Sequence, residues 1–207
     1  MPVRALVFDI GGVLEVVDDD AWPQVWVHRW RTHAGLTEAA FAEAMAAHEP
    51  LGDMATGGAT EAEFRALYAA VLGLDDATAD RMMRELWDAY CGRLDEPLCA
   101  FVATLRPSYT TAILSNSADG ARREEQARYG FEQLVDLVLY SHEIGLAKPD
   151  PAVYALTCQR LGARPEEVLL LDDVPANVEA ARELGWQALL HTDTARSVRE
   201  ITALLAG

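Results

Sequence analysis

Four short apolar runs, each ending in a polar residue, constrain the fold of this chain more than any other feature. They span residues 5–9, 111–115, 137–141 and 168–172, and a fifth run, at 187–191, follows Gly185. Short runs without polar alternation are typical of strands buried on both faces of a parallel sheet. Helical patterns lie between them, such as the one that begins at Asp150 and Pro151 and stops at Gly162. This alternation predicts an α/β fold with a doubly wound, Rossmann-like parallel sheet.

Residues 15–94 interrupt the alternation, because they contain no strong strand pattern. We expect four helices there, at about residues 22–33, 38–48, 61–72 and 77–91, the third with Thr60 and Glu63 as a capping box. The sequence therefore predicts a core of residues 1–14 and 95–207 and a small all-helical cap of residues 15–94. Ligands of open α/β sheets bind beyond the carboxyl ends of the strands, so a cap inserted after the first strand is placed to act as a lid.

Three tryptophans, Trp22, Trp26 and Trp30, recur every four residues and so share one face of the first cap helix. We interpret this face as packing against the other cap helices. A face that contacts substrate or a second subunit remains the alternative.

The composition excludes several classes of partner. The 207 residues carry a formal net charge of −16, and Arg122 with Arg123 is the only basic cluster. Such a chain is a poor candidate for nucleic acid or an anionic membrane surface, and no apolar run approaches the ~18 residues of a membrane span. The N-terminal apolar stretch is too short for a secretory signal, and the three cysteines lack metal-ligand spacing. We therefore expect a cytoplasmic monomer or homodimer without a nucleic-acid or membrane partner.

Polar side chains stand at the carboxyl ends of the predicted strands. They are Asp9, then Ser115 and Asn116, then Asp172 and Asp173 with Asn177 close behind. Alone, each group is explained by a turn or a helix cap, but parallel strands bring all of them to one edge of the sheet. Lys148 follows a strand on the same edge, and the other 16 of the 17 basic residues are arginines. The joint occurrence predicts a functional site at this edge.

The residue types favour phosphate chemistry with a metal ion. Asp9 and Asp173 place two carboxylates together, which repel one another unless a cation lies between them, and oxygen ligands suit Mg²⁺. The hydroxyl of Ser115, the amide of Asn116 and the compact ammonium of Lys148 can hold phosphate oxygens. One oxygen of Asp9 is then free to attack phosphorus and form an aspartyl-phosphate.

Four ordered motifs resemble those of the haloacid dehalogenase-like hydrolase superfamily: Phe-Asp-x-Gly-Gly-Val-Leu, Leu-Ser-Asn, Gly-x-x-Lys-Pro-Asp and Leu-Asp-Asp-x-x-x-Asn. The likeness covers essentially the whole chain, including a helical cap after the first motif. The resemblance implies that Asp9 is the nucleophile and that Lys148 bridges it and the phosphate. The phosphate ligands that it implies are Gly11, Gly12, Ser115, Asn116 and Lys148. The Mg²⁺ ligands that it implies are Asp9, the carbonyl of Gly11 and Asp173, supported by Asp172 and Asn177.

One position departs from the pattern of the family's phosphatases, which usually carry a second Asp two residues after the nucleophile as general acid and base. This chain has Gly11 there, and such an acid is typically worth about 10²–10⁴ in rate. Glu15, Asp18 and His28 are the candidates to replace it.

The sequence favours a Mg²⁺-dependent phosphatase of a small phosphorylated metabolite. A 2-haloacid dehalogenase with the same nucleophile is the first alternative, since its chemistry needs no acid at Gly11. Against it, Asp172 and Asp173 without a metal would repel a carboxylate substrate. The second alternative is a catalytically weak binding or regulatory protein on the same frame, for which Gly11 is the sole support.

Overall fold

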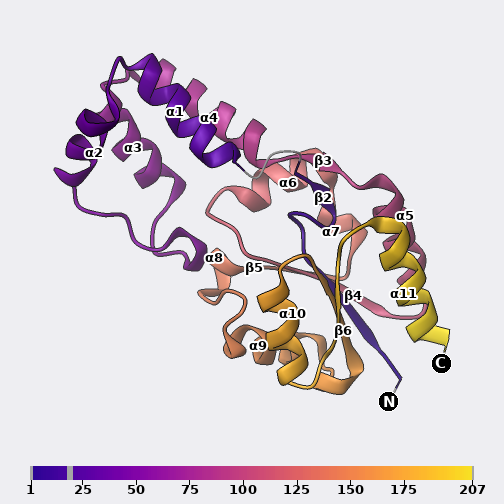
Figure 1. Cartoon of the computed structure of the whole chain (residues 1–207). Helices are drawn as coiled ribbons and strands as arrows, with labels where there is room; N and C mark the ends of the chain where they lie inside the picture. Colours follow the sequence, from indigo (N-terminus) through magenta and orange to yellow (C-terminus); the bar gives the residue numbers. More distant parts are fainter. Residues whose placement is uncertain (1, 18–20, 207) are drawn as a thin grey trace.

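The computed structural model describes residues 2–17 and 21–206, which form an α/β core and a helical cap (Figure 1). The core sheet has five strands in the order β5-β4-β1-β6-β7, and all neighbours are parallel. The strands are β1 Ala5–Phe8, β4 Thr110–Ser115, β5 Leu137–Tyr140, β6 Val168–Asp172 and β7 Gln187–Leu190. The predicted parallel sheet is confirmed, and the five apolar runs form its strands.

Helices cover both faces of this sheet. On one face, Leu6 and Phe8 of β1 share a hydrophobic cluster with side chains of α5 (Glu96–Leu105), α7 (Phe131–Leu134) and α11 (Thr194–Ala206). On the other face, Ala5 and Val7 cluster with α9 (Pro151–Leu161) and α10 (Pro175–Glu183). Side chains of a strand alternate between the faces, so the central strand is apolar at every position. This is why its sequence shows no polar alternation.

The described residues of the cap form four α-helices: α1 Trp22–His33, α2 Glu38–Ala46, α3 Glu61–Leu72 and α4 Asp76–Tyr90. These match the predicted segments within two residues at each end. Thr60 caps α3 as predicted, because its hydroxyl accepts from the backbone of Glu63 while the Glu63 carboxylate accepts from the backbone of Thr60 at 2.8 Å. Trp26, Trp30 and Met82 form the centre of the cap's own hydrophobic cluster.

An antiparallel ribbon of two short strands, β2 Glu15–Val16 and β3 Arg93–Leu94, lies at the predicted boundaries between core and cap. We expected no strand between residues 15 and 94, and the ribbon departs from that expectation. A strand of two residues leaves no periodicity in the sequence to detect.

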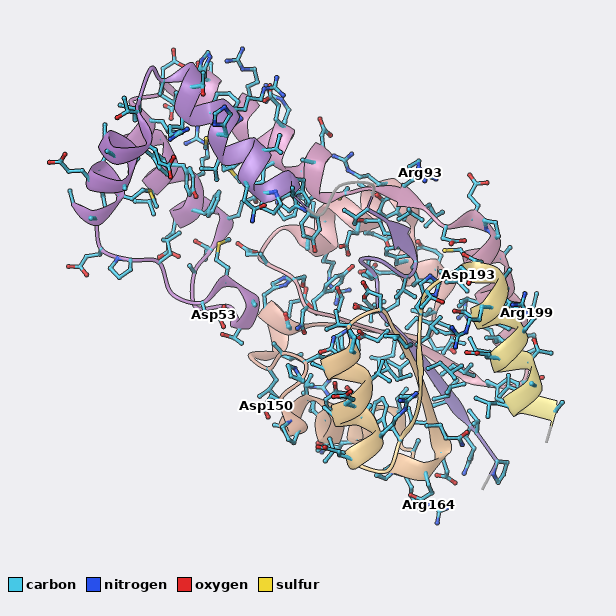
Figure 2. The ribbon with its side chains drawn as sticks, viewed as in Figure 1. Asp53, Arg93, Asp150, Arg164, Asp193 and Arg199 are labelled. Carbon is cyan, nitrogen blue, oxygen red and sulfur yellow. The ribbon has the colours of Figure 1, made fainter. Side chains whose placement is uncertain are left out.

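The cap also contacts the core where η1 (Met54–Thr56) meets α8 (Ser141–Ile144). Gly57 is required at this contact, because a Cβ there would lie 2.3 Å from the carbonyl oxygen of His142. Figure 2 shows Asp53, the residue that caps η1, where this segment of the cap comes down to the core. The cap is therefore held both at the ribbon and at η1.

The remaining core elements are α6 (Ala121–Tyr129), which follows the loop after β4, and η2 (Pro165–Glu167), which precedes β6. Within the part of the chain that the structure describes, none of the helices is both long and apolar enough to cross a membrane.

Candidate active site

Three strand ends meet at one edge of the sheet. β1 lies between β4 and β6, in a register that aligns Phe8 with Ile113 and Leu171. Asp9 follows β1 directly, and its backbone N–H donates to the carbonyl of Leu171 at 3.0 Å. The structure thereby gathers at this edge the residues predicted to act together: Asp9, Ser115, Asn116, Lys148, Asp172, Asp173 and Asn177.

Lys148 joins two of the carboxylates. Its side chain is fully buried, and Nζ lies 2.9 Å from Oδ1 of Asp9 and 2.6 Å from Oδ2 of Asp172. Burial acts to lower the pKa of Lys148, but the charges of Asp9 and Asp172 oppose it, and the pKa lies above its ordinary value. Lys148 therefore remains an ammonium ion at neutral pH and presents its charge to Asp9.

Asp172 is held by the protein itself. Its carboxylate is fully buried and accepts hydrogen bonds from Lys148, from the backbone N–H of Val174 at 2.9 Å and from Nδ2 of Asn177 at 3.0 and 3.1 Å. Asn177 reaches it from the first turn of α10. Because these donors fix the Asp172 carboxylate, it can hold the Lys148 ammonium in place beside Asp9.

Asp9 is oriented through one oxygen. Oδ1 accepts from Lys148 and, at 2.8 Å, from the backbone N–H of Ile10. These two contacts with described residues both use Oδ1, so Oδ2 can take another partner. Burial raises the pKa of Asp9 to about 6; Lys148 opposes this and the charge of Asp172 adds to it. Above that pH the group is a carboxylate, the state in which it can act as a nucleophile.

Asp173 completes an acidic cluster, in which one oxygen each of Asp9, Asp172 and Asp173 lies within 4.8 Å of the others. Oδ1 of Asp173 is buried and has no hydrogen-bond partner among residues 2–17 and 21–206. Burial and the charge of Asp172 raise the pKa of Asp173. Converging carboxylates with an unpaired buried oxygen fit a cation, and their hard oxygen ligands suit Mg²⁺. Since Asp172 is already engaged, Asp9 and Asp173 are the side chains placed to hold it.

The two adjacent glycines differ. Gly12 has φ +74°, and a Cβ there would lie 2.2 Å from Oδ2 of Asp173, so this glycine makes the approach of Asp173 possible. Gly11 lies outside the left-handed region, and a Cβ there would meet no atom of residues 2–17 and 21–206 within 4 Å. The described part of the fold therefore has room for a side chain at Gly11 and shows no steric need for glycine there.

The residues proposed to replace the missing acid are not all near the site. His28 is exposed on α1, where Nδ1 of its ring lies 3.1 Å from the guanidinium of Arg31. Glu15 is buried in β2. Burial raises the pKa of Glu15, and hydrogen bonds from Gly92 and Tyr129 oppose this rise. Asp18 lies outside the described residues.

The side chains of Ser115 and Asn116 have different surroundings. Ser115 is buried at the end of β4. The side chain of Asn116 turns to the Lys148 loop, accepting from the backbone N–H of Lys148 at 2.8 Å and donating to its carbonyl at 2.7 Å. Phosphate binding by Ser115 and Asn116 stays a prediction, and the pairing with Lys148 is a role that the sequence did not indicate.

A cavity of about 420 Å³ lies between the cap and the loop after β4. Residues 116–119 form its wall on the core side, and α1, α3 and α4 supply most of the rest. Trp22 and Trp26 line it, whereas Trp30 packs inside the cap with Arg81 over its ring at 5.2 Å. The tryptophan face therefore serves both packing and the cavity, and its spacing in the sequence does not distinguish the two.

Comparison with known proteins gives a match between residues 3–185 and the family model described as a haloacid dehalogenase-like hydrolase. The chain is 34% identical to bifunctional epoxide hydrolase 2 of Mus musculus over 108 residues, which are 50% of this chain but only 20% of that protein. It is 23% identical to D-ribitol-5-phosphate phosphatase of Bacteroides thetaiotaomicron over 212 residues, 98% of each chain.

A similar solved structure is that of a HAD family enzyme from Bacteroides thetaiotaomicron, in complex with magnesium and inorganic phosphate. The TM-score is 0.72 at 20% identity, over 92% of this chain and 94% of that one. At this identity the likeness shows a shared fold, cap included.

Proposed function

The chain belongs to the haloacid dehalogenase-like hydrolases, and from this premise we propose that it is a Mg²⁺-dependent phosphatase of small phosphate monoesters. One observation carries the proposal: Asp9 contacts the buried ammonium of Lys148 and belongs to an acidic cluster that fits a divalent cation. A carboxylate nucleophile beside fixed positive charge is what phosphoryl transfer requires.

In the first step, Oδ2 of Asp9 attacks phosphorus; the Asp9–phosphorus bond forms and the ester oxygen leaves with its electron pair. Lys148 holds Asp9 through Oδ1 and keeps its proton, so it neutralises charge without acting as an acid. The leaving oxygen takes its proton from water, because Gly11 offers none. Water then attacks phosphorus and the bond from Asp9 Oδ2 to phosphorus breaks, with its electron pair returning to the carboxylate. The proton that the attacking water loses neutralises the hydroxide left by the first step, and inorganic phosphate is released.

Asp9, Asp173 and the carbonyl of Gly11 would hold the metal, and Mg²⁺ bound there would supply positive charge against the phosphate oxygens. The relative named D-ribitol-5-phosphate phosphatase and the structural neighbour with magnesium and phosphate support this assignment. The unpaired buried oxygen of Asp173 supports it from this chain's own residues.

The test is hydrolysis of p-nitrophenyl phosphate by the purified chain, with Mg²⁺ and with excess chelator. We expect turnover only with Mg²⁺, and a fall of more than about a hundredfold in Asp9→Asn, since a nucleophile has no ready substitute. Asp75→Asn is the matched control, because Asp75 is the exposed N-cap of α4 and Asn also caps helices. Full activity in chelator, or in Asp9→Asn, would refute the proposal.

A 2-haloacid dehalogenase is the second candidate, and Gly11 is the observation that favours it. The same samples are therefore given 2-chloropropionate, with chloride release as the readout. Release of chloride without metal and without phosphatase activity would select this candidate. A properly folded chain that acts on neither compound would indicate a binding or regulatory protein.

A further inference from the structure

The cavity between cap and core shares a residue with the candidate active site. Asn116 lines the cavity, and the same side chain holds the backbone of Lys148, whose Nζ contacts Asp9. A phosphate placed at Asp9 therefore lies at the edge from which residues 116–119 lead into the cavity. The cavity is the place where the organic part of such an ester would lie.

The lining of this cavity is largely aromatic and aliphatic. Phe64 and Tyr68 stack at 4.4 Å between ring centroids, and Trp26 lies 5.3 Å from Tyr68. Met83 and Leu86 of α4 also line the cavity. Apolar surface of this kind gains free energy when it is covered by an apolar ligand and gains little from hydroxyl groups.

Several polar side chains of the lining are hydrogen-bonded within the protein. The Glu61 carboxylate accepts from the indole nitrogen of Trp87 at 2.6 Å and from Arg123 at 2.9 and 3.0 Å. Asp119 accepts from the backbone N–H of Glu61 at 2.9 Å. The hydroxyl of Ser117 lies 2.9 Å from Nδ1 of His142, and the Asn116 amide is paired with Lys148.

These pairings disfavour a polyol. A sugar chain in the cavity would place most of its hydroxyls against apolar surface, and it would compete with the pairs around Glu61 and Asp119. Both effects cost free energy. The charge of Glu61 is balanced by Arg123, but the carboxylate of Asp119 also disfavours a second anionic group on the ligand.

From these observations we propose that the cavity binds the leaving group of the substrate, and that this group is an apolar alkyl or aryl moiety. This inference rests on the phosphatase function proposed above and narrows its substrate class. The volume is suitable: an engineered cavity of about 150 Å³ holds benzene, and about 420 Å³ is available here.

The test uses n-alkyl phosphates from ethyl to octyl, whose leaving groups differ in length and hardly in chemistry. We expect kcat/KM to rise by up to about fourfold per added methylene until the cavity is filled. Pentyl phosphate and ribitol 5-phosphate give a matched pair, with the same carbon chain and with or without hydroxyls. We expect pentyl phosphate to be preferred by more than about tenfold, and 2-naphthyl phosphate to be preferred over phenyl phosphate.

Two variants locate the effect. Ala55 lines the cavity, so Ala55→Leu fills part of it and should lower the ratio of kcat/KM for octyl over ethyl phosphate by at least about tenfold. Ala42 lines a groove between α1 and α2 and does not line the cavity, so Ala42→Leu is the same change outside the cavity and should keep the wild-type ratio. If Ala55→Leu does not fold, Ala118→Leu on the core wall gives the same readout.

The outcomes separate this inference from the proposed function. Hydrolysis with a flat dependence on chain length, a preference for ribitol 5-phosphate, or an unchanged ratio in the folded Ala55→Leu variant would overturn the apolar site and leave the phosphatase standing. Failure to hydrolyse any of these esters would overturn both.

Discussion

Asn116 and Lys148 hold one another through a closed pair of hydrogen bonds, 2.8 Å from the backbone nitrogen of Lys148 to Oδ1 and 2.7 Å from Nδ2 to the Lys148 carbonyl. The pair ties the end of β4 to the loop before α9. The Lys148 ammonium then lies 2.9 Å from Asp9. The position of the charge beside Asp9 therefore depends on a residue 32 positions away in the sequence.

The first prediction concerns this pair. Asn116→Ala removes both hydrogen bonds, so the Lys148 loop loses its anchor and kcat should fall by up to about a hundredfold, as for a misplaced catalytic group. The control is Asn116→Asp, which keeps the acceptor for the Lys148 N–H and loses the donor; its kcat should lie between those of wild type and Asn116→Ala. Steady-state kinetics and the inhibition constant of inorganic phosphate are measured. If Asn116→Ala instead keeps kcat and has a larger inhibition constant for inorganic phosphate, Asn116 is a phosphate ligand.

The second prediction concerns the lone lysine. Lys148→Arg should lower kcat by more than about tenfold, because the planar guanidinium is wider than an ammonium and the Lys148 side chain has no exposed surface into which it could move. The reverse exchange at an exposed position, Arg199→Lys, should change nothing measurable; Figure 2 labels this residue. Near-normal kinetics for Lys148→Arg would mean that the position needs only a positive charge.

The third prediction compares the two adjacent glycines. Gly12→Ala should destabilise the fold by about 1 kcal/mol or more and weaken Mg²⁺ binding, since its backbone has φ +74° and the new Cβ would displace Asp173. Gly11→Ala should keep wild-type stability, because its Cβ enters open space. Urea unfolding and the Mg²⁺ dependence of activity provide the measurements. Equal losses of stability in the two variants would contradict this account.

The sequence predicted the parts of the fold that leave a pattern in it. A strand such as β1 is buried on both faces, so its apolar run is unbroken, and Asp9 at its end could be assigned to the sheet edge. The contact between Asn116 and Lys148 could not be predicted, because it depends on how two loops meet. The cavity could not be predicted either, since Trp26 has the same spacing whether it packs in the cap or faces a ligand.

The fourth prediction concerns pH. Glu125 of α6 is buried and accepts from the hydroxyl of Tyr140 at 2.5 Å. Burial raises the pKa of Glu125 to about 8 from its ordinary value of 4.5; the Tyr140 hydrogen bond opposes this and the charge of Glu15 adds to it. Between these two pH values the folded state holds a proton that the unfolded state has lost. The contribution of Glu125 to stability is therefore complete below pH 4.5 and is lost as pH rises to about 8.

The matched variant is Glu125→Gln, which keeps an acceptor for Tyr140 and cannot titrate. The free energy of unfolding from urea titrations at several pH values should fall more steeply in wild type, by at most about 1.4 kcal/mol per pH unit for one proton. Parallel curves for the two proteins would show that Glu125 titrates as in the unfolded chain.

The last prediction concerns the acid that Gly11 does not supply. Without it, the aspartyl-phosphate should form faster from aryl phosphates than from alkyl phosphates, because an aryloxide leaves without a proton. Gly11→Asp should therefore raise kcat on alkyl phosphates by about tenfold or more, and on aryl phosphates by much less. The backbone permits this test, since Gly11 is outside the left-handed region and its Cβ would meet no described atom within 4 Å.

Gly11→Asn is the control, because it has the same shape as Gly11→Asp and carries no acidic proton. A gain in Gly11→Asp alone would assign the effect to proton transfer, whereas equal gains in both variants would assign it to hydrogen bonding. A stable Gly11→Asp protein that binds Mg²⁺ and keeps the wild-type preference between the two ester classes would refute the idea. The acid would then have to come from elsewhere, and Glu15, whose raised pKa favours the protonated form, would be the next residue to substitute.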